Sequence, residues 1–443
     1  MASIIGQALI DIVKCEVLGG EAPEPRILKL LLNTQSGDEE ETARTPFDDM
    51  LDLAEINGII QLVADFFLSK KPKGNNPKAT GKTENLDESL IEKNSPAYKR
   101  LKEAYDAELY RSLTFGTDLS RIGMILEKEG IDYIPLKGAI IRDIYPKPWM
   151  RTSTDMDILV RNEDLDRAVE AITSQPGFMK VNENGHHVLI ESKTGWIIEL
   201  HFSLNAGGSK AEKTLRSAWD HAKPFGEIFT SGAMPASNAS SKSTHKYALE
   251  IEFFYTYFIY HLAHHVSDCG GCGIRAILDL YILNEKLGPK LTAQIENMLS
   301  QNELLEFAKK MSAIADIWFG KGVAIEELAL APEQLEEIER FIIIGGTHGT
   351  KKSSALASHY ASGDKHKKNR IFLSYESLSR RYRGLQGRRY LTPVYEVKRW
   401  ASALTTGGAK RAKESFALDE NISEEEASRT ARIMETIGLG KKN

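Results

Sequence analysis

Cysteine is scarce in this chain, because only Cys15, Cys269 and Cys272 occur among 443 residues. So few cysteines exclude a disulfide-stapled scaffold and are typical of a reducing compartment. A long apolar run is missing too, since the most hydrophobic stretch, residues 253–260, is too short to span a bilayer. The first residues do not combine a basic cluster with an apolar segment, so we expect no signal peptide. We therefore expect a cytoplasmic protein that does not enter a membrane.

A large excess of charge of either sign is also absent. The chain has 57 Lys and Arg against 62 Asp and Glu, a formal net charge of −5, so no overall field draws it to nucleic acid. Lys and Arg nevertheless dominate residues 363–413, where cations alternate with aromatic side chains. This pattern permits nucleic-acid binding through the basic C-terminal segment. Amphipathic helices with a solvated arginine face produce the same pattern, and we favour that interpretation.

The chain length indicates two or three domains. We expect residues 1–115 to form a helical N-terminal region, with helices at 47–68 and 95–129 and a polar linker near 69–89. The second of these helices is expected to break near Gly116. Residues 116–225 are expected to form a core domain. A loop rich in Ser, Ala and Gly at 231–243 then precedes a helical C-terminal domain at 244–443.

Within the core, short apolar runs of strand length alternate with helical patterns. We expect strands at 131–136, 155–160, 187–191 and 196–202, and helices that begin at Gly138 and near Asn162. The predicted fold class is therefore α+β, with a small α/β core between a helical N-terminal flank and a helical C-terminal domain.

Two aspartates one residue apart, Asp155 and Asp157, open one of the predicted strands. Side chains alternate along a strand, so both carboxylates project from the same side, roughly 6.5 Å apart, while Met156 and Ile158 point into a core. Two carboxylates held this close repel each other unless a cation lies between them. A hard cation such as Mg²⁺ prefers oxygen ligands of this kind. The pair therefore predicts a magnesium site.

A third carboxylate, Glu199, lies inside the apolar strand predicted at 196–202, where it shares a face with His201. Charged residues are seldom placed in so apolar a strand without a partner. If this strand neighbours the Asp155 strand, Glu199 joins the same metal cluster as a third ligand or as the base. Three carboxylates suit two metal ions that clamp the attacking and leaving oxygens in phosphoryl or nucleotidyl transfer.

Basic groups near the acidic pair are the candidates for binding phosphate. Lys137 and Gly138 form a turn at the start of a helix, where free N–H groups and a positive dipole end would face a triphosphate. Arg142 and Arg151 are the nearest other cations. An isolated Asp-x-Asp is more often a solvated strand end, and an isolated Lys-Gly is usually only a turn. The combination of these features favours the metal site.

The order of these motifs resembles that of the polymerase-β-like nucleotidyltransferase superfamily, and more narrowly that of the bacterial "uncharacterised nucleotidyltransferase" family. The resemblance covers roughly residues 100–400. It rests on Leu136-Lys137-Gly138, Tyr145-Pro146, Arg151, Asp155-x-Asp157-Ile158-Leu159-Val160, Glu199-x-His201, Tyr260-His261-Leu262-Ala263-His264-His265, Ile274-Arg275, Leu278-Asp279-Leu280 and a closing segment from Ile371 through Tyr382 and Pro393 to Arg399. Where the superfamily has a Gly-Ser pair, this chain has Lys137-Gly138-Ala139 and offers no serine hydroxyl there.

The histidines that precede Cys269 and Cys272 leave several interpretations open. His261 and His264 lie one turn apart on a predicted helix and are expected to face the nucleotide site, where they would bind phosphate or stack on a base. A zinc site at Cys269 and Cys272 is a second interpretation, although only one Cys pair is present. Packed or surface histidines are the third. Arg275 and Asp279, also one turn apart, are expected to form a structural helix pair.

We therefore predict an enzyme, a Mg²⁺-dependent (or Mn²⁺-dependent) nucleotidyltransferase that moves NMP from an NTP to a hydroxyl acceptor and releases pyrophosphate. The acceptor is a small molecule, a protein side chain or an RNA end. Two alternatives stay open. One is a non-catalytic nucleotide- or nucleic-acid-binding module, and the other is a toxin–antitoxin-type interaction protein that retains the fold.

Overall fold

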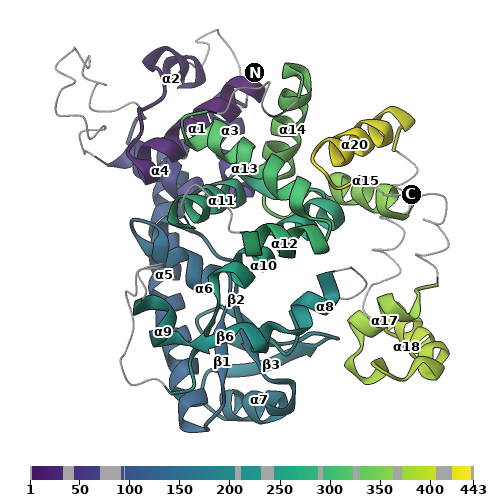
Figure 1. Ribbon diagram of the computed structural model, residues 1–443. Coiled ribbons are helices and arrows are strands. Elements are labelled where there is room, and N and C mark those ends of the chain that lie inside the picture. The colour runs from purple at the N-terminus through teal and green to yellow at the C-terminus, as the bar shows by residue number, and fades with distance from the viewer. Residues whose placement is uncertain are drawn as a thin grey trace.

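The computed structural model is an α+β fold in which helices pack around a five-stranded mixed sheet and a small two-stranded sheet (Figure 1). This architecture confirms the fold class predicted from the sequence pattern. The structure describes residues 2–32, 44–69, 91–93, 95–204, 211–230, 244–287, 293–322, 328, 330–362, 372–405 and 422–440. The predicted linker and the loop at 231–243 fall almost entirely outside these residues.

The N-terminal region is helical, but the helix expected at 47–68 is two helices. The region contains α1 (Ala2–Leu18), α2 (Pro25–Leu32), α3 (Pro46–Ile56) and α4 (Ile60–Leu68). Gly58 has φ +66°, which ends the α-helical path between α3 and α4. The buried Asn57 side chain fixes this break, because it donates to Leu53 O and Ile343 O and accepts from Ile274 N.

Helix α5 (Pro96–Lys128) is one continuous helix of 33 residues. The expected break near Gly116 was wrong, because a single glycine costs only about 1 kcal/mol in a helix and packing against neighbours offsets it. Ser95 caps the N-terminus by accepting from Tyr98 N at 3.2 Å. The helix runs through the boundary expected at residue 115 and contacts both α4 and α7 (Leu165–Thr173).

The sheet contains five strands in the order β1-β2-β5-β4-β3. Strand β1 (Tyr133–Pro135) is antiparallel to β2 (Asp155–Val160), and β2 is parallel to β5 (Ile197–His201). Antiparallel pairing then continues to β4 (His187–Ser192) and β3 (Phe178–Glu183). Strand β3 was not predicted, since most of its residues are exposed and it carries little hydrophobic alternation.

The two faces of the sheet have different environments. Met156 and Ile158 of β2 join an apolar core with residues of α5 and α7, as the alternation predicts. The opposite face carries the polar residues of β2 and β5 toward the helical C-terminal part. Short elements connect β1 to β2 on this side, namely α6 (Gly138–Ile141), η1 (Arg142–Ile144) and η2 (Pro148–Met150), and η3 (Asn162–Asp164) leads into α7.

The segment after the sheet is not entirely helical. Strand β7 (Tyr247–Leu249) pairs with β6 (Ala222–Pro224) in a second, two-stranded sheet, so the helical domain expected from residue 244 has its first helix only at residue 251. Near this sheet lie α8 (Ala211–Arg216), η4 (Ala218–His221) and α9 (Phe225–Thr230).

The C-terminal part is helical, as expected. It contains α10 (Ile251–His264), the π-helical turn η5 (His265–Cys269), α11 (Gly273–Leu287), α12 (Ala293–Gln301), α13 (Leu305–Phe319), α14 (Pro332–Gly345), α15 (Lys351–Ser362), α17 (Tyr375–Arg381), η7 (Arg383–Leu385), η8 (Arg389–Leu391), α18 (Thr392–Thr405) and α20 (Glu424–Thr436). Among the described helices, none has both the length and the apolar character that crossing a membrane requires.

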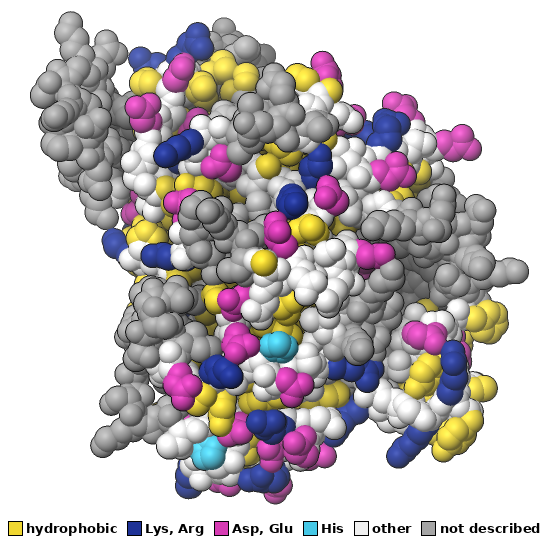
Figure 2. All heavy atoms as spheres, in the orientation of Figure 1, with side chains coloured by type: hydrophobic (Ala, Val, Ile, Leu, Met, Phe, Trp, Pro, Cys, Tyr) yellow, Lys and Arg dark blue, Asp and Glu magenta, His cyan; other side chains and the backbone are white. Residues whose placement is uncertain are grey.

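The basic segment forms a small helical module of α17, η7, η8 and α18 that contacts the sheet side of the protein. Arg383 lies within 3.0 Å of Asp166 and 3.6 Å of Glu183, and its guanidinium covers the Phe202 ring. Basic and apolar side chains share the surface of this module (Figure 2), and the Tyr390 and Trp400 side chains are exposed. Nucleic-acid binding by this segment stays a prediction.

Candidate active site

The acidic residues predicted from the sequence lie on two adjacent parallel strands. In the register of β2 and β5, Asp157 is paired with Glu199, and Asp155 precedes Asp157 on the same face. Asp157 is buried, whereas Asp155 and Glu199 are partly exposed. Parallel pairing of β2 with β5 therefore brings the three predicted carboxylates to one side of the sheet.

His201 links two of these carboxylates. Its Nε2 lies 2.7 Å from Asp157 Oδ1 and 3.2 Å from Glu199 Oε2, and the imidazole is almost fully buried. The ligand atoms of Asp157, Glu199 and His201 lie within 4.8 Å of one another. This oxygen-rich donor set fits a divalent cation, because carboxylates supply most of the ligands that Mg²⁺ and Mn²⁺ prefer.

Lys137 approaches the carboxylates from the turn between β1 and α6. Its Nζ lies 3.0 Å from Asp157 Oδ1, and its φ of +40° is uncommon for a residue with a side chain. The next residue must be small, because a Cβ on Gly138 would lie 2.8 Å from both Arg151 Nη1 and Ser153 Oγ. The tight Lys-Gly turn thus places an ammonium group directly against the acidic cluster.

Charges within this cluster shift the pKa of each member. Burial and the charge of Asp157 raise the pKa of Asp155 to about 6. Burial alone would also raise the pKa of Asp157, but Lys137 and His201 hold it well below its usual range. Burial opposes the charged forms of Lys137 and His201, yet the adjacent carboxylates raise the pKa of both. The raised pKa of Asp155 reflects like-charge repulsion that a dication would relieve.

A cavity of about 350 Å³ lies over this face of the sheet. Of the residues predicted for the site, it is lined by Lys137, Gly138, Arg151, Asp155, Asp157, Glu199, His201, His261 and His264. The opposite wall comes from α10, η5 and α11. Its buried Tyr257 ring lies with its centroid 5.9 Å from the Lys137 ammonium, so sheet and helices enclose one chemically rich cavity.

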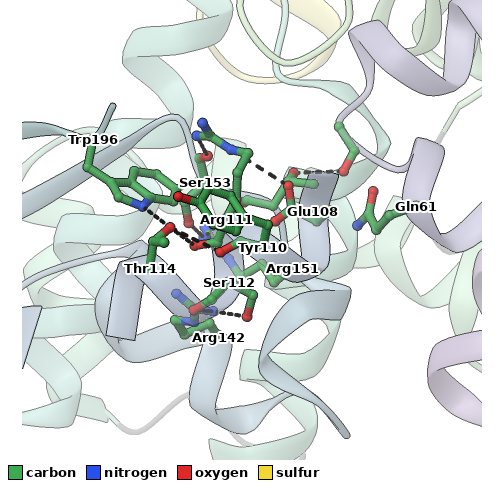
Figure 3. Close-up of polar contacts among 12 residues, drawn as sticks. Gln61, Glu108, Tyr110, Arg111, Ser112, Thr114, Arg142, Arg151, Ser153 and Trp196 are labelled. Carbon is green, nitrogen blue, oxygen red and sulfur yellow. Dashed lines mark hydrogen bonds and ion pairs between the residues drawn. The ribbon is translucent and has the colours of Figure 1, made fainter. Parts of the chain in front are cut away.

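Arg142, which the sequence placed among the phosphate-binding residues, does not line this cavity. Its guanidinium donates to the Ser112 carbonyl at 3.3 Å and to the Ser112 hydroxyl (Figure 3). It also lies 4.3 Å from the centroid of the Phe115 ring. Burial lowers the pKa of Arg142 to about 10. These contacts hold the side chain against α5, and we leave Arg142 out of the proposed site.

Arg151 lines the cavity, but its charge is already balanced. Its Nε and Nη2 donate to the carboxylate of Asp279 at 2.9–3.1 Å, and Tyr145 donates to the same carboxylate at 2.7 Å. All three side chains are buried. The helix pair expected between Arg275 and Asp279 is therefore replaced by a pair between Arg151 and Asp279, residues 128 positions apart.

Arg275 lines the cavity, although the sequence analysis did not include it among the candidates for binding phosphate. Its Nη1 donates to the carbonyl and hydroxyl of Thr152, both at 3.0 Å, while its buried Nε has no hydrogen-bond partner. Burial and the nearby Arg151 lower its pKa. The expected pairing with Asp279 kept Arg275 off the list of site residues, although Arg275 belongs to a motif on which the family resemblance rests.

A zinc site at Cys269 and Cys272 has no support among the described residues. Among the described residues, two groups of side chains could hold a metal ion. One consists of Asp157, Glu199 and His201, and the other of His186, His187 and His201. Neither cluster contains cysteine. Cys272 is buried, and burial raises the pKa of its thiol to about 12. His264 instead lies 3.1 Å from Asp268, one turn further along the chain.

In this α+β fold, carboxylates on adjacent strands face basic side chains across one cavity. A family model described as "Uncharacterised nucleotidyltransferase" matches residues 83–320, more than half of the chain, and the chain belongs to this family. No curated protein and no solved structure matches it.

Family membership confirms the narrower resemblance drawn from the motifs. It assigns the chain a general role in nucleotidyl transfer, and with it an NTP substrate and a divalent metal in general terms. The matched segment contains every predicted site residue. It ends at residue 320, so the similarity expected between Ile371 and Arg399 lies beyond the match.

Proposed function

We propose that this protein transfers NMP from an NTP to a hydroxyl acceptor and releases pyrophosphate, with Mg²⁺ or Mn²⁺ as the metal. The observation that carries this proposal is the pairing of Asp157 with Glu199 on adjacent parallel strands, with Asp155 on the same face of the sheet. All three carboxylates line the cavity that also receives Lys137 and Arg275.

Asp155 and Asp157 would hold the metal, and Glu199 would be the third ligand or the base. When bound, two such cations neutralise phosphate charge and clamp the attacking and leaving oxygens. The triphosphate would lie along Lys137, the Gly138 turn and Arg275. Arg275 takes the place that the sequence gave to Arg142, because its guanidinium faces the cavity and its Nε has no partner.

The proposed step is an in-line displacement at the α-phosphorus. A bond forms between the acceptor oxygen and this phosphorus, and the bond to the oxygen that bridges the α- and β-phosphates breaks. Pyrophosphate leaves with that electron pair, and the acceptor's proton passes to Glu199 if this residue acts as the base. Burial opposes ionisation of Glu199, but the hydrogen bond from His201 and the charges of His201 and His187 together lower its pKa, so the carboxylate is ionised.

The wall formed by α10 would contact the rest of the nucleotide. His261 and His264 line the cavity from this helix. Burial and the nearby Lys137 lower the pKa of His261 well below its ordinary value, so its ring is neutral. A neutral imidazole suits hydrogen bonding or stacking with a base better than ion pairing with phosphate. We therefore assign His261 to the base or sugar and keep His264 as a nucleotide contact.

The test is pyrophosphate release from each of four NTPs with Mg²⁺ or Mn²⁺, with the protein itself, total RNA and a small-molecule extract as acceptor sources. We expect release with wild-type protein and a loss of at least 100-fold in Asp155→Asn and Glu199→Gln, because each change removes one metal-facing charge. Asp166→Asn is the matched control, since this aspartate is exposed and pairs with Arg383 outside the cavity.

Undiminished release in folded Asp155→Asn and Glu199→Gln would refute the assignment. Calorimetric binding of Mg·NTP without any product from the three acceptor sources would instead favour the non-catalytic binding module.

A further inference from the structure

Three histidines meet beside the carboxylates, at one end of β4 and β5. His187 is paired with His201 across the two strands, and His186 immediately precedes β4. Their ring centroids are 4.3 Å apart for His186 and His187, 5.1 Å for His187 and His201, and 5.8 Å for His186 and His201. One ligand atom from each ring lies within 4.8 Å of the other two.

The Nδ1 atoms of all three rings are buried and have no hydrogen-bond partner. His187 and His201 are more than nine-tenths buried. Buried polar atoms are normally satisfied, so three unsatisfied nitrogens in one cluster point to a missing ligand.

We propose that His186, His187 and His201 form a binding site for a first-row transition-metal dication of the Zn²⁺ type. Imidazole nitrogen favours zinc and related ions, whereas Mg²⁺ prefers oxygen ligands. Three histidines with an open fourth position are an established zinc donor set. Ring centroids about 5 Å apart agree with nitrogens arranged tetrahedrally around one ion at about 2.0–2.1 Å. The nearby carboxylates add electrostatic attraction for a dication.

The hydrogen bonds around His201 already suit this role. Its Nε2 faces Asp157 and Glu199, so a proton on Nε2 is shared with carboxylates, and a metal ion would take the place of a second proton on Nδ1. This arrangement of carboxylate, histidine and metal orients a ligand and increases its basicity. An ion at the histidine site therefore also fixes the proton that His201 presents to the carboxylates.

Asn184 provides a sharper test of His187. Asn184 Oδ1 accepts from the backbone N–H groups of His186 and His187, which places Asn184 Nδ2 2.8 Å from His187 Nε2. An amide NH₂ at that position favours a proton on His187 Nδ1, which weakens this ring as a ligand. An aspartate would keep the backbone contacts and accept a proton from Nε2, so Asn184→Asp should strengthen metal binding.

The experiment titrates Zn²⁺ into metal-free full-length protein by calorimetry, with excess Mg²⁺ and no nucleotide. We expect one Zn²⁺ per chain, with affinity at least tenfold weaker in His186→Ala and about tenfold tighter in Asn184→Asp. His264→Ala is the matched control, because this histidine lines the same cavity outside the cluster. Co²⁺ in place of Zn²⁺ should give the visible absorption of a tetrahedral site.

The proposal is overturned if wild-type protein binds no Zn²⁺ under these conditions, or if Cys269→Ser abolishes binding while His186→Ala does not. The site stands independently of the proposed nucleotidyl transfer. The zinc titration contains no NTP, so a failure to observe pyrophosphate release would not affect its result. A failure to bind Zn²⁺ would likewise not affect the test of nucleotidyl transfer.

Discussion

Replacing Lys137 tests how the acidic cluster is held together. The Lys137 ammonium lies 3.0 Å from Asp157 Oδ1, and the two side chains are only 17% and 3% exposed. Lys137→Met removes the charge, keeps most of the side-chain length and leaves Asp157 with His201 as its remaining donor among these contacts. We expect a substantial loss of stability in metal-free buffer.

The magnitude follows from the depth of this ion pair. Two unit charges 3.0 Å apart attract by about 5 kcal/mol at an effective dielectric constant of about 20. Breaking a buried pair costs about 3–5 kcal/mol in practice. We take the lower end, about 3 kcal/mol, because His201 still donates to Asp157. Urea unfolding with and without Mg²⁺ measures this loss as a decrease in the free energy of unfolding.

Magnesium should restore much of the stability lost by Lys137→Met, since the dication replaces the missing ammonium beside Asp157. Saturating a site at about 100 times its dissociation constant adds about 2.7 kcal/mol. Lys137→Gly should lose less than Lys137→Met, because glycine relieves the positive φ of the turn. Lys102→Met is the matched control from an exposed pair with Asp106 and should change little. Equal stability of Lys137→Met and wild type in metal-free buffer would refute this reasoning.

Three further changes test other parts of the site. Arg275→Gln should weaken Mg·NTP binding by about 10–100-fold, which corresponds to the loss of one charged hydrogen bond. Arg142→Gln should leave this binding unchanged, and calorimetry that shows the reverse for the two variants would contradict the cavity assignment. Burial raises the pKa of Glu108 to about 7, although Arg111 and other nearby arginines oppose this shift. The unfolded chain therefore loses this proton more readily than the folded protein, and stability decreases as the pH rises from 4.5 to 7. The free energy of unfolding of Glu108→Gln, relative to wild type, should therefore increase by about 3 kcal/mol between those pH values in urea titrations. If the difference between the two proteins does not change with pH, the assignment is wrong. Asp279→Asn should cost about 3–5 kcal/mol of unfolding free energy by leaving the buried Arg151 unpaired, and a loss below about 1 kcal/mol would show that the pair is not structural.

Much of the core could be predicted because its signals are local. The bounds expected for β2 match the observed strand, and alternation alone identified the face that Asp155 and Asp157 share. The end of α3 could not be placed from hydrophobic periodicity, because Asn57 fixes it through contacts with residues more than 200 positions away. Exposed β3 and the short β7 carry too little hydrophobic alternation to distinguish them from loop or helix.

The site was predictable where one strand carries its pattern and unpredictable where partners come from distant segments. Glu199 and His201 were found because charged side chains inside an apolar strand are conspicuous. Arg275 was not considered for the site because Asp279, one turn away, was expected to be its partner. The observed partner of Asp279 is Arg151. His186 was missed as a ligand because only the pairing of β4 with β5 brings it to His201.

Label transfer from NTP tests the central claim most directly. Parallel reactions would contain NTP labelled at the α- or the γ-phosphate, with wild-type protein and Asp155→Asn. Nucleotidyl transfer predicts that the α-label enters the acceptor while the γ-label leaves in pyrophosphate, and that Asp155→Asn transfers neither. Entry of the γ-label into the acceptor, or unchanged α-label transfer by folded Asp155→Asn, would contradict the account.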